Sequence, residues 1–209
     1  MKRLLFFGDS ITDARRSRDE DDWLGSGYVA LIAGLLGSEH PGEYEILNRG
    51  ISGDRSVDLY ARIKKDCLNL KPDVITIYIG VNDVLHEAAH QNGVSNQKFY
   101  QVINLILDEI RNDLPESQVI LISPFVFPGA ITDYAWTYIH AEVPLRAQML
   151  EQIAQEKKLP LIRLQSVFEE AILHTQQLYF IRDGVHPTIG GHGVIAREWI
   201  RTYKGLIES

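Results

Sequence analysis

Four short segments of the sequence carry the residue types that acyl transfer requires. This chemistry needs a nucleophile, a base that takes its proton, an acid that orients the base, and hydrogen-bond donors for the oxyanion. Ser10 lies in the run Gly8-Asp9-Ser10-Ile11-Thr12-Asp13, directly after an apolar stretch, and can serve as the nucleophile. Serine in such a run is also common in turns and at helix N-termini. A chemical role for Ser10 therefore depends on partners elsewhere in the chain.

An acid and a base occur together near the other end of the chain. In Asp183-Gly184-Val185-His186-Pro187 the carboxylate precedes the histidine by three residues, so one loop can carry both. A tight turn can aim Asp183 at one imidazole nitrogen of His186 and leave the other nitrogen facing Ser10. The alternative is an exposed turn that caps the final helix.

Two glycine-containing segments can supply oxyanion donors. The run Gly50-Ile51-Ser52-Gly53-Asp54 lets a backbone N–H approach a ligand closely. The run Gly80-Val81-Asn82-Asp83 adds an amide side chain. Each run alone is also typical of the turns that follow strands.

The elements that must position these segments form an alternating pattern. Apolar runs predict strands at residues 2–7, 44–47, 74–79, 119–123 and 161–164. Helices are expected at 27–36, 56–68, 97–112, 138–157, 166–174 and 188–203, with a polar stretch at 80–95 and an aromatic-rich loop at 124–138. Near-continuous apolar strands between helices predict an α/β fold: a three-layer α/β/α sandwich around a five-stranded parallel sheet. Each polar segment follows a strand or lies near the last one, so right-handed crossovers bring them to one sheet edge.

Composition is that of an ordinary globular protein and excludes several classes. The chain has 209 residues, of which 45% are hydrophobic and 23% charged, and no linker divides it, so residues 1–209 are expected to form one domain. No apolar run approaches the roughly 20 residues that span a bilayer. The single cysteine, Cys67, cannot form an intrachain disulfide. The short apolar start lacks a secretory h-region, which predicts a cytoplasmic protein.

Charge and motifs give no sign of nucleic acid, cofactor or metal as a partner. The net charge is −7, and the Lys and Arg residues are scattered rather than gathered in a stripe. The glycine runs match no nucleotide-binding pattern. Asp183, His186 and His192 could be considered as metal ligands, but the two histidines are six positions apart, a spacing that does not place both on one helical face. We therefore predict no nucleic-acid partner, no cofactor and no metal.

Taken together, the four segments resemble the SGNH hydrolase superfamily, also called GDSL esterases. The matching residues, in chain order, are Gly8-Asp9-Ser10, Gly53, Gly80-Val81-Asn82-Asp83 and Asp183-x-x-His186. The resemblance implies a flavodoxin-like sheet and a catalytic triad of Ser10 as nucleophile, His186 as base and Asp183 as its orienting acid. It also implies an oxyanion hole made by the N–H groups of Ser10 and Gly53 and the side chain of Asn82.

A narrower likeness concerns the substrate. The runs at 8–13, 25–29, 48–53 and 80–84 are similar to those of bacterial carbohydrate acetylesterases, including intracellular acetylxylan esterases. This implies removal of O-acetyl groups from xylo-oligosaccharides or similar sugars. Two alternatives stay open: a lysophospholipase or acyl-thioesterase for longer acyl chains, and a carbohydrate-binding protein that has the fold without turnover.

Other residues of the chain compete for these roles. An acid also precedes a histidine by three residues in Asp83-Val84-Leu85-His86. With these, Ser52 could act as an alternative nucleophile and His86 as its base. Aromatic residues in and near the 124–138 loop suit either sugar stacking or packing in a lid or subunit contact. Such an apolar loop also makes a homo-oligomer plausible.

Overall fold

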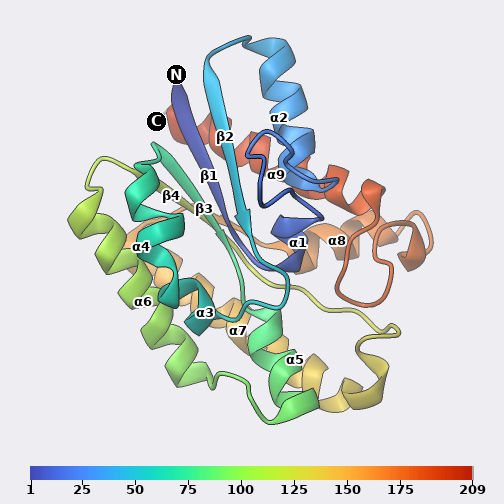
Figure 1. Ribbon diagram of the computed structural model, residues 1–209. Coiled ribbons are helices and arrows are strands. Elements are labelled where there is room, and N and C mark those ends of the chain that lie inside the picture. The colour runs from blue at the N-terminus through green and yellow to red at the C-terminus, as the bar shows by residue number, and fades with distance from the viewer. Residues whose placement is uncertain (209) are drawn as a thin grey trace.

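The computed structural model describes residues 1–208 and centres on a parallel sheet with the strand order β2-β1-β3-β4-β5 (Figure 1). The strands are β1 (Lys2–Gly8), β2 (Tyr44–Gly50), β3 (Val74–Tyr78), β4 (Gln118–Ile122) and β5 (Leu161–Ile162). Every neighbouring pair is parallel. This order is the flavodoxin-like one, in which the chain reverses direction across the sheet beside β1 and β3. The predicted five-stranded parallel sheet is therefore confirmed.

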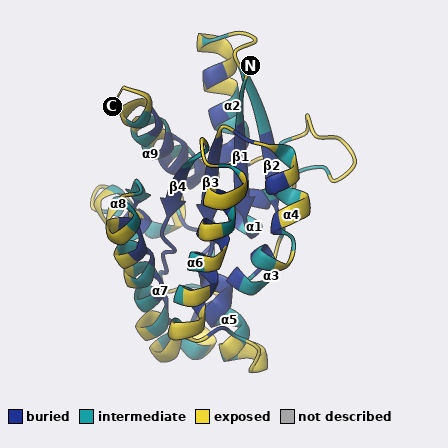
Figure 2. Ribbon diagram, turned by 90° about the vertical axis from the view of Figure 1, so that its left-hand side faces the viewer, coloured by how far each residue is buried: buried dark blue, intermediate teal, exposed yellow. Residues whose placement is uncertain are grey.

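Helices cover both faces of this sheet and complete the three-layer α/β/α sandwich. They are α1 (Ser10–Asp13), α2 (Tyr28–Glu39), α3 (Ser56–Ala61), α4 (Ile63–Asp66), α5 (Val81–His90), α6 (Asn96–Asp113), α7 (Trp136–Lys157), α8 (Leu164–Ile172) and α9 (Ile189–Ile207). Short 3₁₀ turns lie at Leu68–Leu70, Asp133–Ala135 and Gln177–Tyr179. Figure 2 shows the strands buried between the helices, whose exposed residues face outward.

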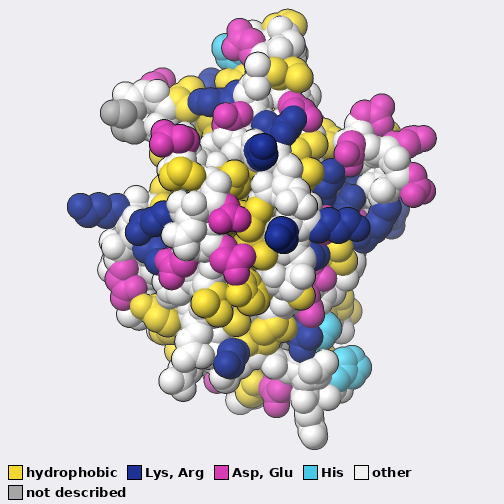
Figure 3. Space-filling view, turned by 60° about the vertical axis from the view of Figure 1, so that its left-hand side comes forward, with side chains coloured by type: hydrophobic (Ala, Val, Ile, Leu, Met, Phe, Trp, Pro, Cys, Tyr) yellow, Lys and Arg dark blue, Asp and Glu magenta, His cyan; other side chains and the backbone are white. Residues whose placement is uncertain are grey.

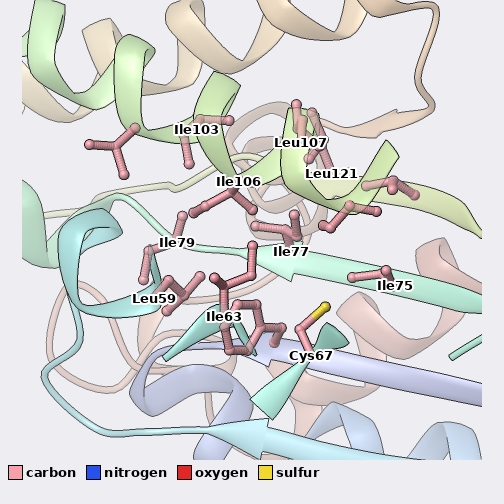
Figure 4. Close-up of a cluster of buried hydrophobic side chains, with 14 of the residues drawn as sticks. Leu59, Ile63, Cys67, Ile75, Ile77, Ile79, Ile103, Ile106, Leu107 and Leu121 are labelled. Carbon is pink, nitrogen blue, oxygen red and sulfur yellow. The ribbon is translucent and has the colours of Figure 1, made fainter. Parts of the chain in front are cut away.

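The pleat of β1 divides the core into two layers. Leu5 and Phe7 face a cluster built with α3, α4, α6 and α7, whereas Leu4 and Phe6 face one built with α2, α8 and α9. Successive strand residues point to opposite faces, so an apolar run such as this one fills both layers at once. Figure 4 shows the first cluster, with Ile63 and Ile106 packed on the β3 side chains around Ile77.

Several parts of the chain differ from the pattern that the sequence predicts. Residues 10–13 form the short helix α1, and the strand expected at 161–164 ends at Ile162, because Leu164 already begins α8. The polar stretch at 80–95, for which the sequence predicts no element, contains the helix α5. Its first turn buries Asn82 and Asp83, but Val81, Val84, Leu85 and Ala88 follow the apolar spacing of a helix and pack in one cluster, so the sequence contains a helical signal that the prediction missed. The single helix expected at 56–68 is broken at Arg62, which has φ −113° and ψ 8°. At this break the Arg62 side chain donates to Asp54 and to the Gly8 carbonyl oxygen at the sheet edge, and also to Asp66 of α4.

The aromatic-rich loop at 124–138 is largely packed against the body of the protein. Phe125 and Val126 are buried, and Phe125 contacts the ring of Phe168 in α8 at a centroid distance of 4.6 Å. Trp136 begins α7 and packs against the ring of His140. Tyr134, at 58% exposed, and Tyr138, at 39%, are large aromatic side chains of this loop that face solvent. Core packing thus accounts for part of the loop.

The surface mixes charges of both signs. On the face drawn in Figure 3, Lys and Arg side chains lie among Asp and Glu side chains. Within residues 1–208, no helix has the length and apolar character needed to cross a membrane.

Candidate active site

Ser10 stands at the junction between β1 and the four-residue helix α1. Gly8 ends the strand under tight constraint, because a Cβ there would lie 2.4 Å from the carbonyl oxygen of Tyr78. Asp9 caps the helix, its Oδ1 accepting the Ile11 N–H at 3.0 Å. This close packing sets where Ser10, which is half-buried, presents its hydroxyl.

Asp183 and His186 share one tight turn just before α9. The Asp183 Oδ1 accepts the backbone N–H of His186 at 2.9 Å, and Oδ2 lies 2.9 Å from His186 Nδ1. Gly184 makes the turn possible with φ +106°, a conformation that L side chains rarely adopt. Burial opposes ionisation of Asp183, but the hydrogen bonds from the His186 backbone and ring outweigh it and hold the pKa of Asp183 below its usual value.

The two ends of the chain meet at the hydroxyl of Ser10. The Ser10 Oγ lies 3.0 Å from His186 Nε2, although 176 residues separate them in sequence. The hydrogen of the neutral imidazole lies on Nδ1, where it points to Asp183. Nε2 therefore carries no hydrogen and can accept one from the Ser10 hydroxyl. The predicted nucleophile, base and acid thus lie in one hydrogen-bonded chain, an arrangement that can deprotonate a serine as it attacks.

The three expected oxyanion donors lie after neighbouring strands β1, β2 and β3. Within residues 1–208, the backbone N–H groups of Ser10 and Gly53 donate to no protein acceptor. Gly53 has φ +88°, and no atom lies within 4 Å of the place where a Cβ would stand. The Asn82 side chain donates one amide hydrogen to the Asp54 carbonyl oxygen at 3.0 Å, which orients the group and leaves its second hydrogen available.

Buried carboxyl groups surround this edge of the sheet. Asp9 is fully buried, and desolvation raises its pKa from 3.8 to about 7, with the charges of Asp83 and Asp54 adding to the effect. Burial also raises the pKa of Asp83 to about 6, despite hydrogen bonds from the backbone and hydroxyl of Ser56. These acids support the loops on which Ser10 and Asn82 stand.

Two side chains that the sequence does not mark as site residues tie the loops together. The Asn48 Nδ2 donates to the carbonyl oxygens of Thr12 at 2.7 Å and Leu24 at 2.9 Å, and so joins the end of β2 to α1. Arg62 donates to the carboxylate of Asp54 at 2.7 Å and to the carbonyl oxygen of Gly8 at 3.1 Å. Asn48 lies near the end of β2, where polar residues indicate a site, whereas Arg62 lies between two helices and carries no such signal in the sequence.

His192 is a third residue that the sequence does not place in the site. Its Nδ1 accepts the backbone N–H of Tyr28 at 3.1 Å. Burial, helped by the positive charges of Arg182 and His186, lowers the pKa of His192 to about 4. The ring is therefore neutral at neutral pH and keeps its remaining N–H on Nε2.

A cavity of about 370 Å³ opens beside the Ser10 hydroxyl. Its walls include the side chains of Ser10, Ser52, His186 and His192. The wall also includes the apolar residues Ile11, Ala14, Pro187 and Ile189, so polar and apolar groups share it.

The competing arrangement from the sequence is not assembled. Asp83 directs its carboxylate to Ser56 and not to His86, whose ring instead contacts that of His90 at a centroid distance of 6.1 Å. His192 bonds Tyr28 and does not join Asp183 and His186 as a third ligand. In the described part of the chain, no group of three or more His, Cys, Asp or Glu side chains is arranged to hold a metal ion.

Comparison with known proteins places this geometry in a family. The GDSL-like lipase/acylhydrolase family matches residues 6–194. The acetylxylan esterase of Geobacillus stearothermophilus is 33% identical over 96% of this chain and 93% of its own length.

Solved structures agree with that match. The crystal structure of Axe2, the acetylxylan esterase of G. stearothermophilus, superposes with a TM-score of 0.85 and 31% identity, over 96% of this chain and 93% of that one. A protein of Parabacteroides merdae assigned as a GDSL-like lipase gives a TM-score of 0.89 and 31% identity, over 96% and 94%. The chain therefore belongs to the GDSL-like lipase/acylhydrolase family and is a carboxylic ester hydrolase.

Proposed function

We propose that this esterase removes O-acetyl groups from carbohydrates such as acetylated xylo-oligosaccharides, with Ser10 as nucleophile. The observation that carries the proposal is the hydrogen-bonded chain from Ser10 Oγ through His186 to Asp183, with distances of 3.0 and 2.9 Å. Similarity to an acetylxylan esterase over nearly the whole chain supports the acetyl group and the sugar.

The first half of the reaction acetylates the enzyme. Ser10 Oγ attacks the acetyl carbonyl carbon while His186 Nε2 takes the hydroxyl proton, and the carbonyl π electrons move to oxygen. The N–H groups of Ser10 and Gly53 and the free amide hydrogen of Asn82 stabilise that oxyanion. When the oxyanion collapses, the bond to the sugar oxygen breaks and His186 gives this oxygen the proton, so acetyl-Ser10 and a free sugar hydroxyl remain.

The second half repeats these steps with water. His186 Nε2 takes a proton from the water that attacks acetyl-Ser10, and returns it to Ser10 Oγ as the acyl bond breaks and acetic acid leaves. Asp183 stays ionised throughout and stabilises the imidazolium that forms in each half. The lowered pKa of Asp183 suits this role.

The test compares p-nitrophenyl esters from acetate to dodecanoate and acetylated xylo-oligosaccharides as substrates. Two serines of the same cavity give a matched pair of variants, Ser10→Ala and Ser52→Ala. We expect cleavage of acetate and of the sugars, a loss of at least about a thousandfold in kcat for Ser10→Ala, and a change of only a few-fold for Ser52→Ala.

The other outcomes separate the alternatives. Activity that rises with acyl-chain length, with none on the sugars, would move the substrate to lipids or thioesters and keep the esterase machinery. Full activity in Ser10→Ala would overturn the nucleophile. A folded parent protein that binds acetylated sugar and cleaves no ester would indicate a binding protein.

A further inference from the structure

Two arginine side chains line the cavity beside Ser10 without partners of their own. Of the thirteen arginines, ten bond or pair with a carboxylate or a carbonyl oxygen. In the described residues 1–208, the guanidinium groups of Arg15, Arg111 and Arg182 have no such contact. Arg15 and Arg182 line the cavity of Ser10, whereas Arg111 lines a different one. Two of the three unpaired arginines thus face one site in a chain of net charge −7.

The backbone holds both of these arginines beside the catalytic groups. The Arg182 N–H donates to the His186 carbonyl oxygen at 2.9 Å, across the turn that carries the base. Arg15 directly follows α1 and has φ +66°, after Ala14 at φ +40°. Left-handed backbone is unfavourable at residues other than glycine, so contacts must hold it. One is the bond from Ser26 N–H to the Ala14 carbonyl oxygen at 2.8 Å.

The rest of the cavity offers little negative charge to these cations. Asp13 also lines the wall, but its Oδ2 already accepts from Arg18 at 2.8 Å and from the Ser52 N–H at 3.1 Å. The Nδ1 of His192 accepts the Tyr28 backbone N–H, so this neutral ring offers only its remaining N–H to the cavity. The acidic residues at 19 and 21 line a separate cavity. Within residues 1–208, the charged groups of the cavity wall that have no partner are therefore the two guanidinium groups.

We propose that Arg15 and Arg182 bind an anionic substituent, a carboxylate or a phosphate, on the sugar that carries the acetyl ester. This inference rests on the proposed function and narrows its substrate class. A guanidinium matches either anion with two parallel hydrogen bonds. A neutral xylo-oligosaccharide presents hydroxyl groups only and leaves these two exposed guanidinium groups to water. The substituent belongs to the alcohol part of the ester, since the acetyl group itself has no charge.

The test uses three methyl glycosides that are acetylated at every ring hydroxyl and differ only at the exocyclic carbon. One is the neutral glucoside, one the glucuronide with its carboxylate, and one the phosphorylated glucoside. The test variant is the double substitution Arg15→Gln and Arg182→Gln. The matched control is Arg111→Gln, which removes the third unpaired arginine, away from Ser10. The readout is the ratio of kcat/KM for each anionic sugar to that for the neutral one, so a general loss of activity cancels.

We expect the parent enzyme to prefer the carboxylate or the phosphate by about tenfold, the usual scale for a charge-assisted hydrogen bond. The larger of the two ratios identifies the anion. The double variant should bring that ratio down to about one, Arg111→Gln should keep it, and added salt should reduce it in the parent.

A parent ratio of one or less for both anions, or a ratio that survives in the double variant, would overturn the inference. Turnover of p-nitrophenyl acetate with no turnover of any of the three sugars would also overturn it, and would leave the esterase chemistry standing. A folded parent protein that cleaves neither the sugars nor p-nitrophenyl acetate would overturn the proposed function itself.

Discussion

Neighbouring residues at this site have opposite environments. Asp9 is fully buried while Ser10, the next residue, reaches the cavity. Ser10, Asp183 and His186 could be predicted as one site because their types suit acyl transfer and because the four segments together resemble the SGNH hydrolase superfamily. The contacts of Asn48 with Thr12 and of His192 with Tyr28 could not be predicted. They join segments whose meeting depends on the whole fold.

The buried acid Asp9 predicts a pH-dependent stability. Its pKa is 3.8 when unfolded and about 7 when folded, so the native state binds this proton more tightly. The stabilisation by that proton is complete below about pH 4 and is lost as the pH rises to about 7. Asp9→Asn should therefore raise the free energy of unfolding relative to the parent, by up to about 4 kcal/mol at pH 8 and by less at pH 5. Urea denaturation at both pH values measures this difference.

Asp58 is the matched control for Asp9. Hydrogen bonds and the charge of Arg55 hold the pKa of Asp58 below its usual value, with burial opposing them. This stabilisation is present above the unfolded pKa of about 4 and is constant from pH 5 to pH 8. Asp58→Asn should lower the free energy of unfolding equally at both pH values. An Asp9→Asn effect that is also the same at pH 5 and pH 8 would disprove the proton-binding role of Asp9.

The orienting acid gives a second prediction for a single residue. Asp183→Asn preserves size but offers Nδ1 of His186 an amide, so the imidazole can adopt the tautomer that turns an N–H toward Ser10. We expect kcat on p-nitrophenyl acetate to fall by about 10³ to 10⁴ with a small change in KM. Asp133→Asn, which alters a carboxylate bonded to the Gly129 N–H, is the control. A loss under tenfold for Asp183→Asn would exclude the assigned role.

The helices that pack on the sheet lie close to the ranges that the sequence predicts, whereas the segments next to the site differ from the prediction. Helix α6 buries Phe99, Ile103, Ile106 and Ile110 at helical spacing, and the predicted range 97–112 is close to the observed Asn96–Asp113. Helix α5 was not predicted, although Val81, Val84, Leu85 and Ala88 lie at helical spacing and pack in one cluster. The break at Arg62, in contrast, corresponds to no apolar pattern in the sequence.

Two glycines test how the turn before α9 is held. A Cβ on Gly184, which has φ +106°, would lie 2.6 Å from the Phe127 carbonyl oxygen. Gly184→Ala should lower the free energy of unfolding by about 2 kcal/mol or more and reduce kcat, because the turn carries both Asp183 and His186. Gly34→Ala, exposed in α2 with no atom within 4 Å, should instead stabilise the protein by about 0.5–1 kcal/mol. Similar melting temperatures for the two variants would contradict this account.

At the scale of the whole molecule, the sheet joins both core layers and both ends of the chain. Trp199 of α9 shows this connection, since its Nε1 donates to Thr76 Oγ1 in β3 at 2.8 Å. Ser10 and His186 meet only when β1 and the turn before α9 are both in place. Catalysis should therefore require the complete fold and not one half of it.

This connection predicts that residues 1–209 unfold as one domain. Urea denaturation followed by tryptophan fluorescence, which reports on Trp23, Trp136 and the buried Trp199 together, and by far-ultraviolet circular dichroism should give coincident single transitions. Loss of esterase activity should follow the same curve. Two separated transitions would show that the layers fold as independent units.

The most direct test of the central claim is to identify the residue that becomes acylated. A fluorophosphonate that mimics the tetrahedral intermediate should add once per chain, and peptide mass spectrometry should locate the adduct on Ser10. The account predicts that Ser10→Ala abolishes labelling, that Ser52→Ala retains it, and that His186→Ala slows it by orders of magnitude. An adduct on Ser52, or undiminished labelling of Ser10→Ala, would contradict the account.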